Sequence, residues 1–179
     1  MKTKLLVTLG CATLALPVLV ACTAVAQQAP APVAAAKAPV ASAPVVTYRA
    51  NIQPFIKAQC AECHGADAPT LAEFKLAEEK YTKAKLGPRT DTYENLLQIV
   101  AYTDTGAFMR RLDDGTNTAD KKPGNMYKHL GETDGERAAN LKMIKAWVGE
   151  GAWNLNRWQK RGDVPAITKE QLDKLQLKY

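Results

Sequence analysis

Histidine and cysteine are scarce in this chain, and several common sequence signatures are missing from it. The 179 residues include only two histidines and four cysteines. There is no phosphate-binding P-loop, dinucleotide-binding fingerprint or internal repeat, which argues against a nucleotide-dependent enzyme or a repeat protein. The formal net charge is +6, yet the sequence has no long lysine and arginine cluster and no basic patch interleaved with aromatic residues. The basic composition therefore does not indicate nucleic-acid binding.

Two of the four cysteines stand in the pattern C-x-x-C-H, formed by Cys60, Cys63 and His64. This spacing is typical of a c-type haem attachment site. The two thiols would form thioether bonds to the two vinyl groups of one haem, and the imidazole of His64 would be the proximal ligand of its iron. The pattern thus predicts one covalent haem c, with Cys60 and Cys63 as the attachment residues.

Two other uses of a C-x-x-C pair fit the sequence less well. A thioredoxin-like redox dithiol is expected near a β-α-β pattern, and no convincing strand flanks the motif. A structural zinc site needs four cysteine or histidine ligands. Cys11 and Cys22 lie in a targeting segment, so only the distant His129 would complete a ligand set with the motif.

The N-terminus has the pattern of a bacterial lipoprotein signal peptide over residues 1–21. Two lysines precede an apolar run, Leu5–Val20, that is too short for a membrane-spanning helix. The run leads into Leu-Val-Ala-Cys, which resembles a lipobox, and cleavage before Cys22 would make that cysteine the site of lipidation. An ordinary signal cleaved after Ala26 is the alternative. Both interpretations predict export, and bacterial c-type haem attachment takes place outside the cytoplasm.

Residues 22–47 are almost entirely alanine, proline, valine and glutamine. Such a composition offers little to a core and favours extended backbone. We interpret this segment as a membrane tether, which leaves residues 48–179 as one folded domain of ordinary size. The arrangement predicts a protein at the periplasmic face of a bacterial membrane, held there by a lipid anchor.

The folded part is predicted to be mostly helical, with long loops. Apolar residues recur at helical spacing in several stretches. The expected helices cover about 51–60, 71–85, 91–100, 107–112, 134–150 and 168–175, and residues 116–125 are expected to form a loop. Thr133 and Thr168 each open a capping-box pattern. Asn51 and Asp91 are the expected N-caps of two further helices.

A haem iron has a second axial position, whose occupant separates electron transfer from ligand binding. The candidates are Met109, Met126, Met143 and His129. Met109 and Met143 lie in helical runs, where methionine commonly packs in a core. Met126 follows Pro-Gly-Asn in a polar loop, where an apolar side chain needs a function, so we expect it to be the distal iron ligand. His129 is the alternative, because imidazole is a strong iron ligand.

Together these features resemble the class I monohaem cytochrome c family. The matching stretches are Ile-Gln-Pro-Phe before the haem motif, the loop methionine Met126, and Ile144–Ala152, which is similar to the tryptophan-containing end of many bacterial cytochrome c domains. The resemblance covers about residues 48–153. It implies an all-α fold around one haem, in which the first and last main helices cross with Phe55 and Trp147 at the contact.

The chain departs from that family in two places. Members often have proline beside the distal methionine, whereas Met126 is followed by Tyr127 and the nearest proline is Pro123. The stretch between the haem motif and Met126 is also long, since it includes the expected helix at 71–85. These departures leave Met109 open as a second alternative for the distal ligand.

The resemblance implies a one-electron carrier between membrane or periplasmic redox partners, rather than an enzyme. Exposed lysines near the haem edge would dock an acidic partner weakly and quickly. The candidates are Lys57, Lys75, Lys121, Lys122 and Lys128. If the distal position is open, the alternative is a peroxidase-like haem enzyme or a ligand-binding haem sensor. A cytochrome-c-type peroxidase would be expected to have a second C-x-x-C-H motif, which the sequence lacks.

Overall fold

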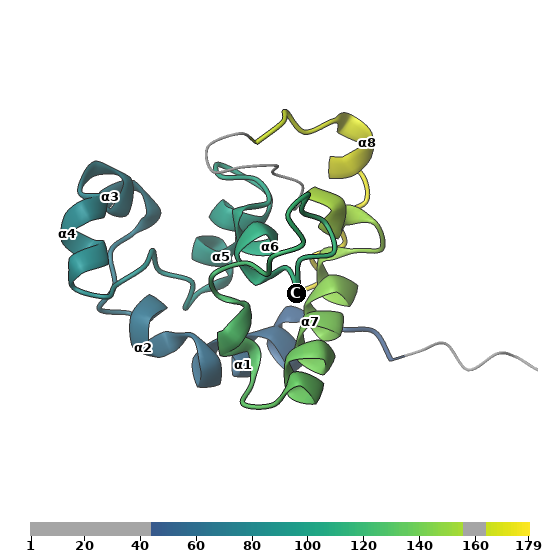
Figure 1. Cartoon of the computed structure of the whole chain (residues 1–179), viewed down its shortest axis with the longest axis horizontal. Coiled ribbons are helices and arrows are strands. Elements are labelled where there is room, and N and C mark those ends of the chain that lie inside the picture. Colours follow the sequence, from purple (N-terminus) through teal and green to yellow (C-terminus); the bar gives the residue numbers. More distant parts are fainter. Residues whose placement is uncertain (1–43, 156–163) are drawn as a thin grey trace, which may run out of the picture. The chain divides into compact units, whose positions relative to one another are not determined.

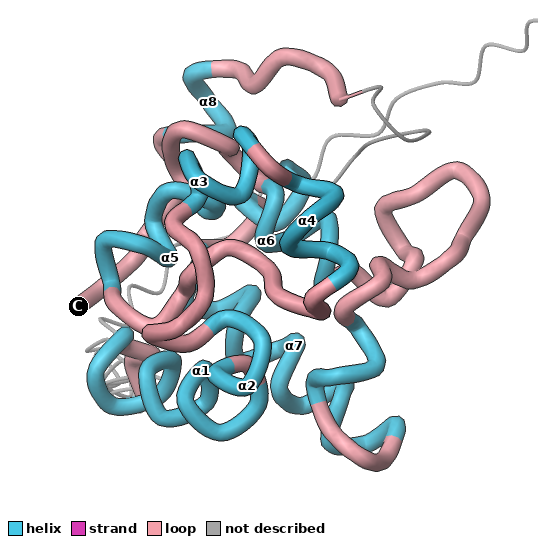
Figure 2. The backbone as a smooth tube through the Cα atoms, turned by 90° about the vertical axis from the view of Figure 1, so that its left-hand side faces the viewer, coloured by secondary structure: helices cyan, strands magenta, loops and turns pink. Residues whose placement is uncertain are grey.

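The computed structural model describes residues 44–155 and 164–179, and these residues form helices and loops without any strand (Figures 1 and 2). The elements in chain order are η1 (Tyr48–Ile52, a turn of π-helix), α1 (Gln53–Gln59), α2 (Ala61–His64), α3 (Leu71–Leu76), α4 (Glu78–Lys83), α5 (Tyr93–Val100), α6 (Ala107–Leu112), η2 (Tyr127–Leu130, a 3₁₀ turn), α7 (Asp134–Val148), η3 (Ala152–Leu155, a 3₁₀ turn) and α8 (Lys169–Leu172). The predicted all-α fold is confirmed. The predicted signal peptide, Cys22 and most of the predicted tether lie outside the described residues. No helix within the described ranges is long and apolar enough to cross a bilayer.

The first helical segment begins earlier than the sequence suggested. Thr47, rather than Asn51, is the N-cap, and its hydroxyl accepts a hydrogen bond from the backbone N–H of Ala50 at 3.2 Å. The side-chain oxygen of Asn51 accepts from the N–H of Thr47 at 3.0 Å, so Asn51 supports the cap from inside the helix. Pro54 stands in the first turn of α1, where a backbone N–H is not needed. The segment η1–α1 then ends at Cys60.

The expected helix at 71–85 is two short helices, α3 and α4, separated by a non-helical residue, Ala77. Phe74 and Tyr81 would lie about 10.5 Å apart along the axis of a straight helix. Their ring centroids are instead 6.3 Å apart and stacked, so the break brings the two rings together. Of the residues in α3 and α4, only Leu71 is buried. In Figure 1 this pair of helices lies at the edge of the domain, away from α7.

Helix α5 is capped by Thr92 and not by the expected Asp91. The hydroxyl of Thr92 accepts from the backbone N–H of Asn95 at 3.2 Å. The carboxylate of Asp91 instead accepts from the side-chain amide of Asn95 at 3.2 Å and from the guanidinium of Arg89. Threonine and aspartate can both cap a helix. Here Thr92 is the cap, because the carboxylate of Asp91 is bonded to Arg89 and to the side chain of Asn95.

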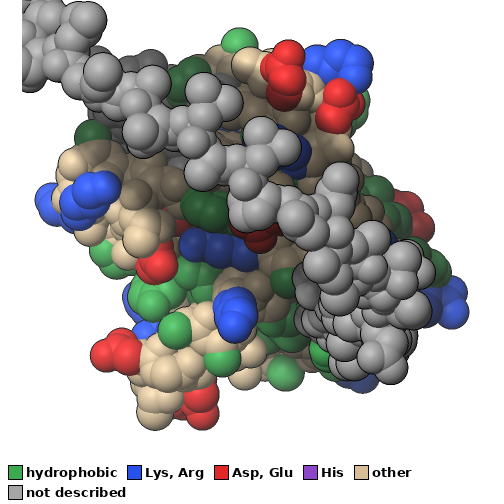
Figure 3. All heavy atoms as spheres, turned by 90° about the vertical axis from the view of Figure 1, so that its right-hand side faces the viewer, with side chains coloured by type: hydrophobic (Ala, Val, Ile, Leu, Met, Phe, Trp, Pro, Cys, Tyr) green, Lys and Arg blue, Asp and Glu red, His purple; other side chains and the backbone are tan. Residues whose placement is uncertain are grey.

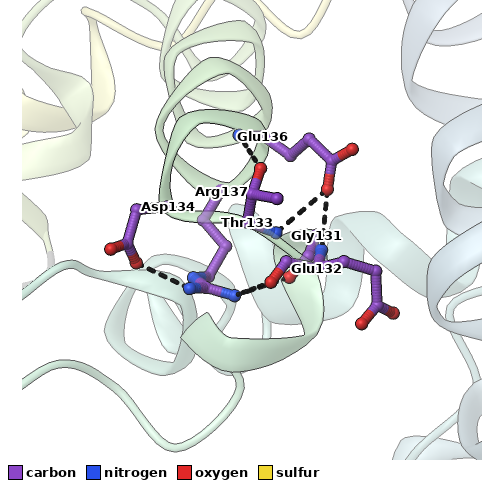
Figure 4. Close-up of polar contacts among 6 residues, drawn as sticks. All are labelled: Gly131, Glu132, Thr133, Asp134, Glu136 and Arg137. Atoms are coloured by element: carbon purple, nitrogen blue, oxygen red, sulfur yellow. Dashed lines mark hydrogen bonds and ion pairs between the residues drawn. The ribbon is translucent and has the colours of Figure 1, made fainter.

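The capping box predicted at the start of α7 is confirmed, and Figure 4 shows it in detail. The hydroxyl of Thr133 accepts from the N–H of Glu136 at 3.2 Å. The carboxylate of Glu136 accepts in return from the N–H groups of Thr133 at 3.1 Å and of Glu132 at 2.8 Å. Arg137 adds bonds to Asp134 and to the carbonyl oxygen of Glu132. The capping box predicted at Thr168 is also present, although α8 ends at Leu172.

The contact between α7 and the beginning of the domain is aromatic. Trp147 is fully buried in α7, and its ring centroid lies 6.4 Å from that of Tyr48 in η1 and 6.5 Å from that of Tyr93 in α5. Trp147 therefore lies at the contact between α7 and η1, where it meets the ring of Tyr48 in place of the expected Phe55, which is buried in the same core. Aromatic pairs of this kind stabilise by more than their buried area.

The C-terminal tail closes this core through its backbone. The carbonyl oxygen of Lys178 accepts hydrogen bonds from the indole N–H of Trp147 at 3.0 Å and from the backbone N–H of Tyr48 at 2.7 Å. The hydroxyl of Tyr93 donates to the carbonyl oxygen of Leu177 at 2.7 Å. The ring of Tyr179 stacks on Tyr48 with centroids 5.7 Å apart. The tail thus satisfies polar groups that the packing of η1, α5 and α7 would otherwise leave buried without partners.

Deletion of Leu177–Tyr179 should therefore lower the free energy of unfolding by about 3 kcal/mol or more, since it removes one aromatic ring and the acceptors for three buried or half-buried donors. Urea unfolding of the full chain and the shortened one measures the difference. Lys178→Ala is the matched control, because the exposed Lys178 side chain does not make these bonds. It should stay within about 0.5 kcal/mol of wild type. A shortened chain as stable as wild type would contradict a closing role for the tail.

Candidate haem site

The two cysteines of the motif stand at the junction of α1 and α2. Cys60 ends α1 with its N–H bonded to the carbonyl oxygen of Ile56 at 2.9 Å, and it also precedes the first residue of α2. The N–H groups of Cys63 and His64 both bond to the carbonyl oxygen of Cys60, at 3.3 Å and 2.9 Å. This single helical turn places the two thiols and the imidazole on one short, hydrogen-bonded segment. Both thiols are free and half-buried.

The ring of His64 is held by a carbonyl oxygen from a distant part of the chain. Its Nδ1 lies 2.7 Å from the carbonyl oxygen of Pro88. A carbonyl can only accept, so Nδ1 carries the proton and donates it, and Nε2 is the nitrogen left with a lone pair. This is the arrangement in which a metal-ligating histidine is oriented and made more basic by its other ring nitrogen. The donor set fits a covalently attached haem with Nε2 of His64 on its iron.

Residues 87–90, here called the proximal segment, bind the haem motif along their backbone. The N–H of Gly87 donates to the carbonyl oxygen of Cys63 at 2.9 Å, and the N–H of Thr90 donates to that of His64, also at 2.9 Å. A Cβ at position 87 would overlap the ring of His64, so only glycine allows this approach. The helical spacing of 71–85 did not predict this role of Gly87 and Pro88, which follow that stretch. The available signal was a Gly-Pro pair placed after a motif histidine that needed an acceptor.

An ion pair fixes the proximal segment to the start of α5. The guanidinium of Arg89 donates from Nε to one carboxylate oxygen of Asp91 at 3.0 Å and from its terminal nitrogen to the other at 2.8 Å. This two-bond geometry is the strong form of the pair. Hydrogen bonding from Arg89 holds the pKa of Asp91 below its usual value, so the carboxylate stays charged near neutral pH.

Neither rival of the haem interpretation gains support from the geometry. Burial raises the pKa of the Cys60 thiol to about 11, whereas a reactive dithiol needs a lowered thiol pKa. Within residues 44–155 and 164–179, no three histidine, cysteine, aspartate or glutamate side chains gather as a metal-binding group. His129, the residue required to complete a zinc set, is exposed on η2.

The four candidates for the distal ligand differ in their surroundings. Met109 is 1% exposed, enclosed by protein atoms on every side in α6. His129 is exposed, whereas Met126 and Met143 are half-buried and pack against the core. Met126 alone of the three methionines lies outside a helix, as the N-cap of the short turn η2.

Comparison with known proteins shows a relationship over the whole described domain. A family model described as PccH cytochrome c matches residues 47–179. Among solved structures, the chain is similar to the monoheme cytochrome PccH from Geobacter sulfurreducens, with 50% sequence identity and a TM-score of 0.65 over 76% of this chain and 100% of that one. No curated protein matches the chain. The family match includes the C-terminal tail, so the tail belongs to the common domain.

Replacement of Gly87 by alanine should prevent the native placement of His64, because the added methyl group overlaps the imidazole ring. We expect the exported Gly87→Ala protein to contain little covalently bound haem. Absorbance of the haem relative to protein in purified samples measures this. Gly135→Ala is the matched control, since the nearest atom to its added Cβ is the Thr133 hydroxyl at 4.0 Å. It should retain wild-type haem content, and equal haem content in both variants would contradict the proposed packing.

Proposed function

The chain belongs to the PccH cytochrome c family, and on that basis we propose that it is a periplasmic one-electron carrier whose iron is bound by His64 and Met126. Family membership means a monohaem c-type cytochrome with one covalent haem, which acts as an electron carrier and not as an enzyme. The axial ligands, the location and the partners belong to the proposal. The observation that carries it is the bond from Nδ1 of His64 to Pro88, which leaves Nε2 available as a ligand.

The haem supplies a metal ion that accepts and releases one electron. The chain's own residues set the conditions for that step. Cys60 and Cys63 would fix the haem by thioether bonds, so it cannot dissociate during turnover. Pro88 orients the ring of His64 and raises the basicity of its ligating nitrogen. A thioether from Met126 would raise the potential relative to a second imidazole and would leave no position for a substrate.

The assignment of Met126 draws on its backbone as well as its burial. Its N–H donates to the carbonyl oxygen of Arg111 at 2.9 Å, which ties the residue to the end of α6. The side chain is half-buried and faces the core cluster. Met109 has no free surface, and His129 is exposed, so neither alternative offers a ligand at the edge of the core.

Three of the five candidate lysines remain in the proposed docking surface. Lys75 pairs with Asp104 at 3.6 Å, and Lys121 donates to the carbonyl oxygen of Thr116 at 3.2 Å. Within the described part of the chain, no carboxylate forms an ion pair with Lys57, Lys122 or Lys128, which leaves these three for an acidic partner. On the face drawn in Figure 3, basic and acidic side chains alternate rather than forming one patch. Lys57, Lys122 and Lys128 suit a weak and transient contact with an acidic partner.

Export and lipid anchoring extend the proposal to residues outside the described ranges. The signal pattern of residues 1–21 and the lipobox before Cys22 support an exported protein anchored to a bacterial membrane. Residues 22–47 would then be a tether between the anchor and the cytochrome c domain at 48–179. The donor and acceptor would be redox proteins of the membrane or the periplasm.

Substitution of Met126 by alanine should abolish the near-infrared sulfur-to-iron charge-transfer band of the oxidised protein. The midpoint potential should fall by on the order of 100 mV, within the range of about 0.8 V that axial ligands span. Near-infrared absorption and a redox titration measure the two effects. Met143→Leu, which removes a half-buried thioether from α7, is the control and should keep the band. A band that survives in Met126→Ala would assign the ligand elsewhere, and rapid carbon monoxide binding by reduced wild type would argue against a carrier.

Intact-mass spectrometry of the exported protein should give a chain that begins at Cys22 and carries one haem and one lipid modification. Cys22→Ala should lose the lipid and move the cytochrome from the membrane fraction to the soluble fraction, with unchanged haem content. A wild-type mass that corresponds to cleavage after Ala26 without lipid would contradict the anchor and leave the electron-carrier proposal intact.

A further inference from the structure

Asp113 is a fully buried carboxylate at the end of α6. One of its oxygens accepts hydrogen bonds from the backbone N–H groups of Gly115 at 2.9 Å and Asn117 at 3.2 Å. The other accepts from the side-chain amide of Asn117 at 3.0 Å. Among the described residues, no lysine or arginine forms an ion pair with Asp113. Burial of a charge is costly, and here N–H donors from the following turn offset that cost in place of a cation.

The loop that begins at Asp113 ends at Met126, and its two ends are bonded to each other. The N–H of Gly124 donates to the carbonyl oxygen of Asp113 at 2.8 Å, and the N–H of Met126 donates to that of Arg111 at 2.9 Å. A Cβ at position 124 would overlap the carbonyl oxygen of Arg111, so the two backbones are in close contact. We call residues 113–126 the distal loop. Met126 is thus fixed at the point where the distal loop closes.

Inside the distal loop, hydrogen bonds connect the turn after Asp113 to the later part of the loop, at Lys122. The hydroxyl of Thr118, which is buried, lies 3.3 Å from the carbonyl oxygen of Gly115 and 3.2 Å from that of Lys122. Thr118 follows directly after Asn117, whose backbone and side chain both bond to Asp113. These hydrogen bonds, together with the peptide bond between Asn117 and Thr118, therefore connect the Asp113 carboxylate to the segment that precedes Met126.

We propose that Asp113 is a positioning residue for Met126: its carboxylate holds the distal loop in the shape that presents the Met126 sulfur to the iron. The inference rests on the proposed function, because it takes Met126 as the distal ligand. Asp113 would then set how easily that ligand is displaced, without touching the haem. Asp120, by contrast, is exposed at the other end of the loop. Its carboxylate accepts from the N–H of Lys122 at 3.0 Å, and hydrogen bonding with Lys122 and Thr118 lowers its pKa.

Titration of the oxidised haem-loaded protein with imidazole tests this role. Imidazole competes with Met126 for the iron, and loss of the sulfur-to-iron band reports the displacement. Removal of a buried acceptor that serves several donors should make Asp113→Ala bind imidazole about tenfold more tightly or better. Asp113→Asn keeps an oxygen for the backbone donors and should recover most of the wild-type resistance. Glu132→Ala, which removes an exposed acid outside this network, is the control and should behave as wild type.

Imidazole binding by Asp113→Ala that equals wild type would overturn the role of Asp113. If Asp113→Ala does not accumulate with haem, Asn117→Ala replaces it. That variant keeps the carboxylate and removes only its side-chain donor, so imidazole should bind about threefold more tightly, and unchanged binding would overturn the inference. Absence of the sulfur-to-iron band in wild type, or its survival in Met126→Ala, would overturn the ligand assignment and this inference together. This inference alone would be overturned if the band is lost in Met126→Ala and imidazole removes it from Asp113→Ala at the same concentration as from wild type.

Discussion

The haem site depends on one hydrogen bond, the 2.7 Å contact from Nδ1 of His64 to the carbonyl oxygen of Pro88. The motif Cys60–His64 brings two thiols and an imidazole together, but it does not fix the ring. The Pro88 carbonyl does so, because an acceptor at Nδ1 determines both the tautomer and the orientation of Nε2. Other features serve this contact. Gly87 allows the chain to reach the ring, and the pair of Arg89 with Asp91 secures the segment against α5.

The two proposed iron ligands are supported in the same physical way. Each is held by backbone hydrogen bonds between segments that are distant in sequence or separated by a loop. His64 is bonded through the proximal segment, and Met126 through its pairing with Arg111. Backbone bonds between close-packed segments permit less adjustment than the rotamers of exposed side chains. A site held in this way would change little in geometry between the two oxidation states of the iron, which is what an electron carrier requires of its protein.

Features set by neighbours in sequence could be predicted from the sequence. The haem motif and the capping boxes at Thr133 and Thr168 are local patterns with a fixed spacing, and the capping boxes are present in the structure. Features set by distant partners could not be predicted. Asp91 does not cap α5 as expected, because its carboxylate is bonded to Arg89. The helical spacing of 71–85 does not indicate the break at Ala77. The roles of Pro88 and of the tail carbonyls needed coordinates, since any residue can supply a backbone acceptor, and the Gly-Pro pair at 87–88 is only an indirect signal.

The position of α3 and α4 has a consequence for how this domain can vary. Both helices belong to an excursion of the chain that leaves after His64 and returns at Gly87, and the hydrogen bond from Gly87 to Cys63 joins its two ends. The excursion lies at the edge of the domain (Figure 1). Because its ends already meet, a longer or shorter excursion alters the closure entropy only slightly. This stretch is therefore a natural place for insertions, deletions or an introduced reporter, because a change in its length leaves the bonds that hold His64 in place.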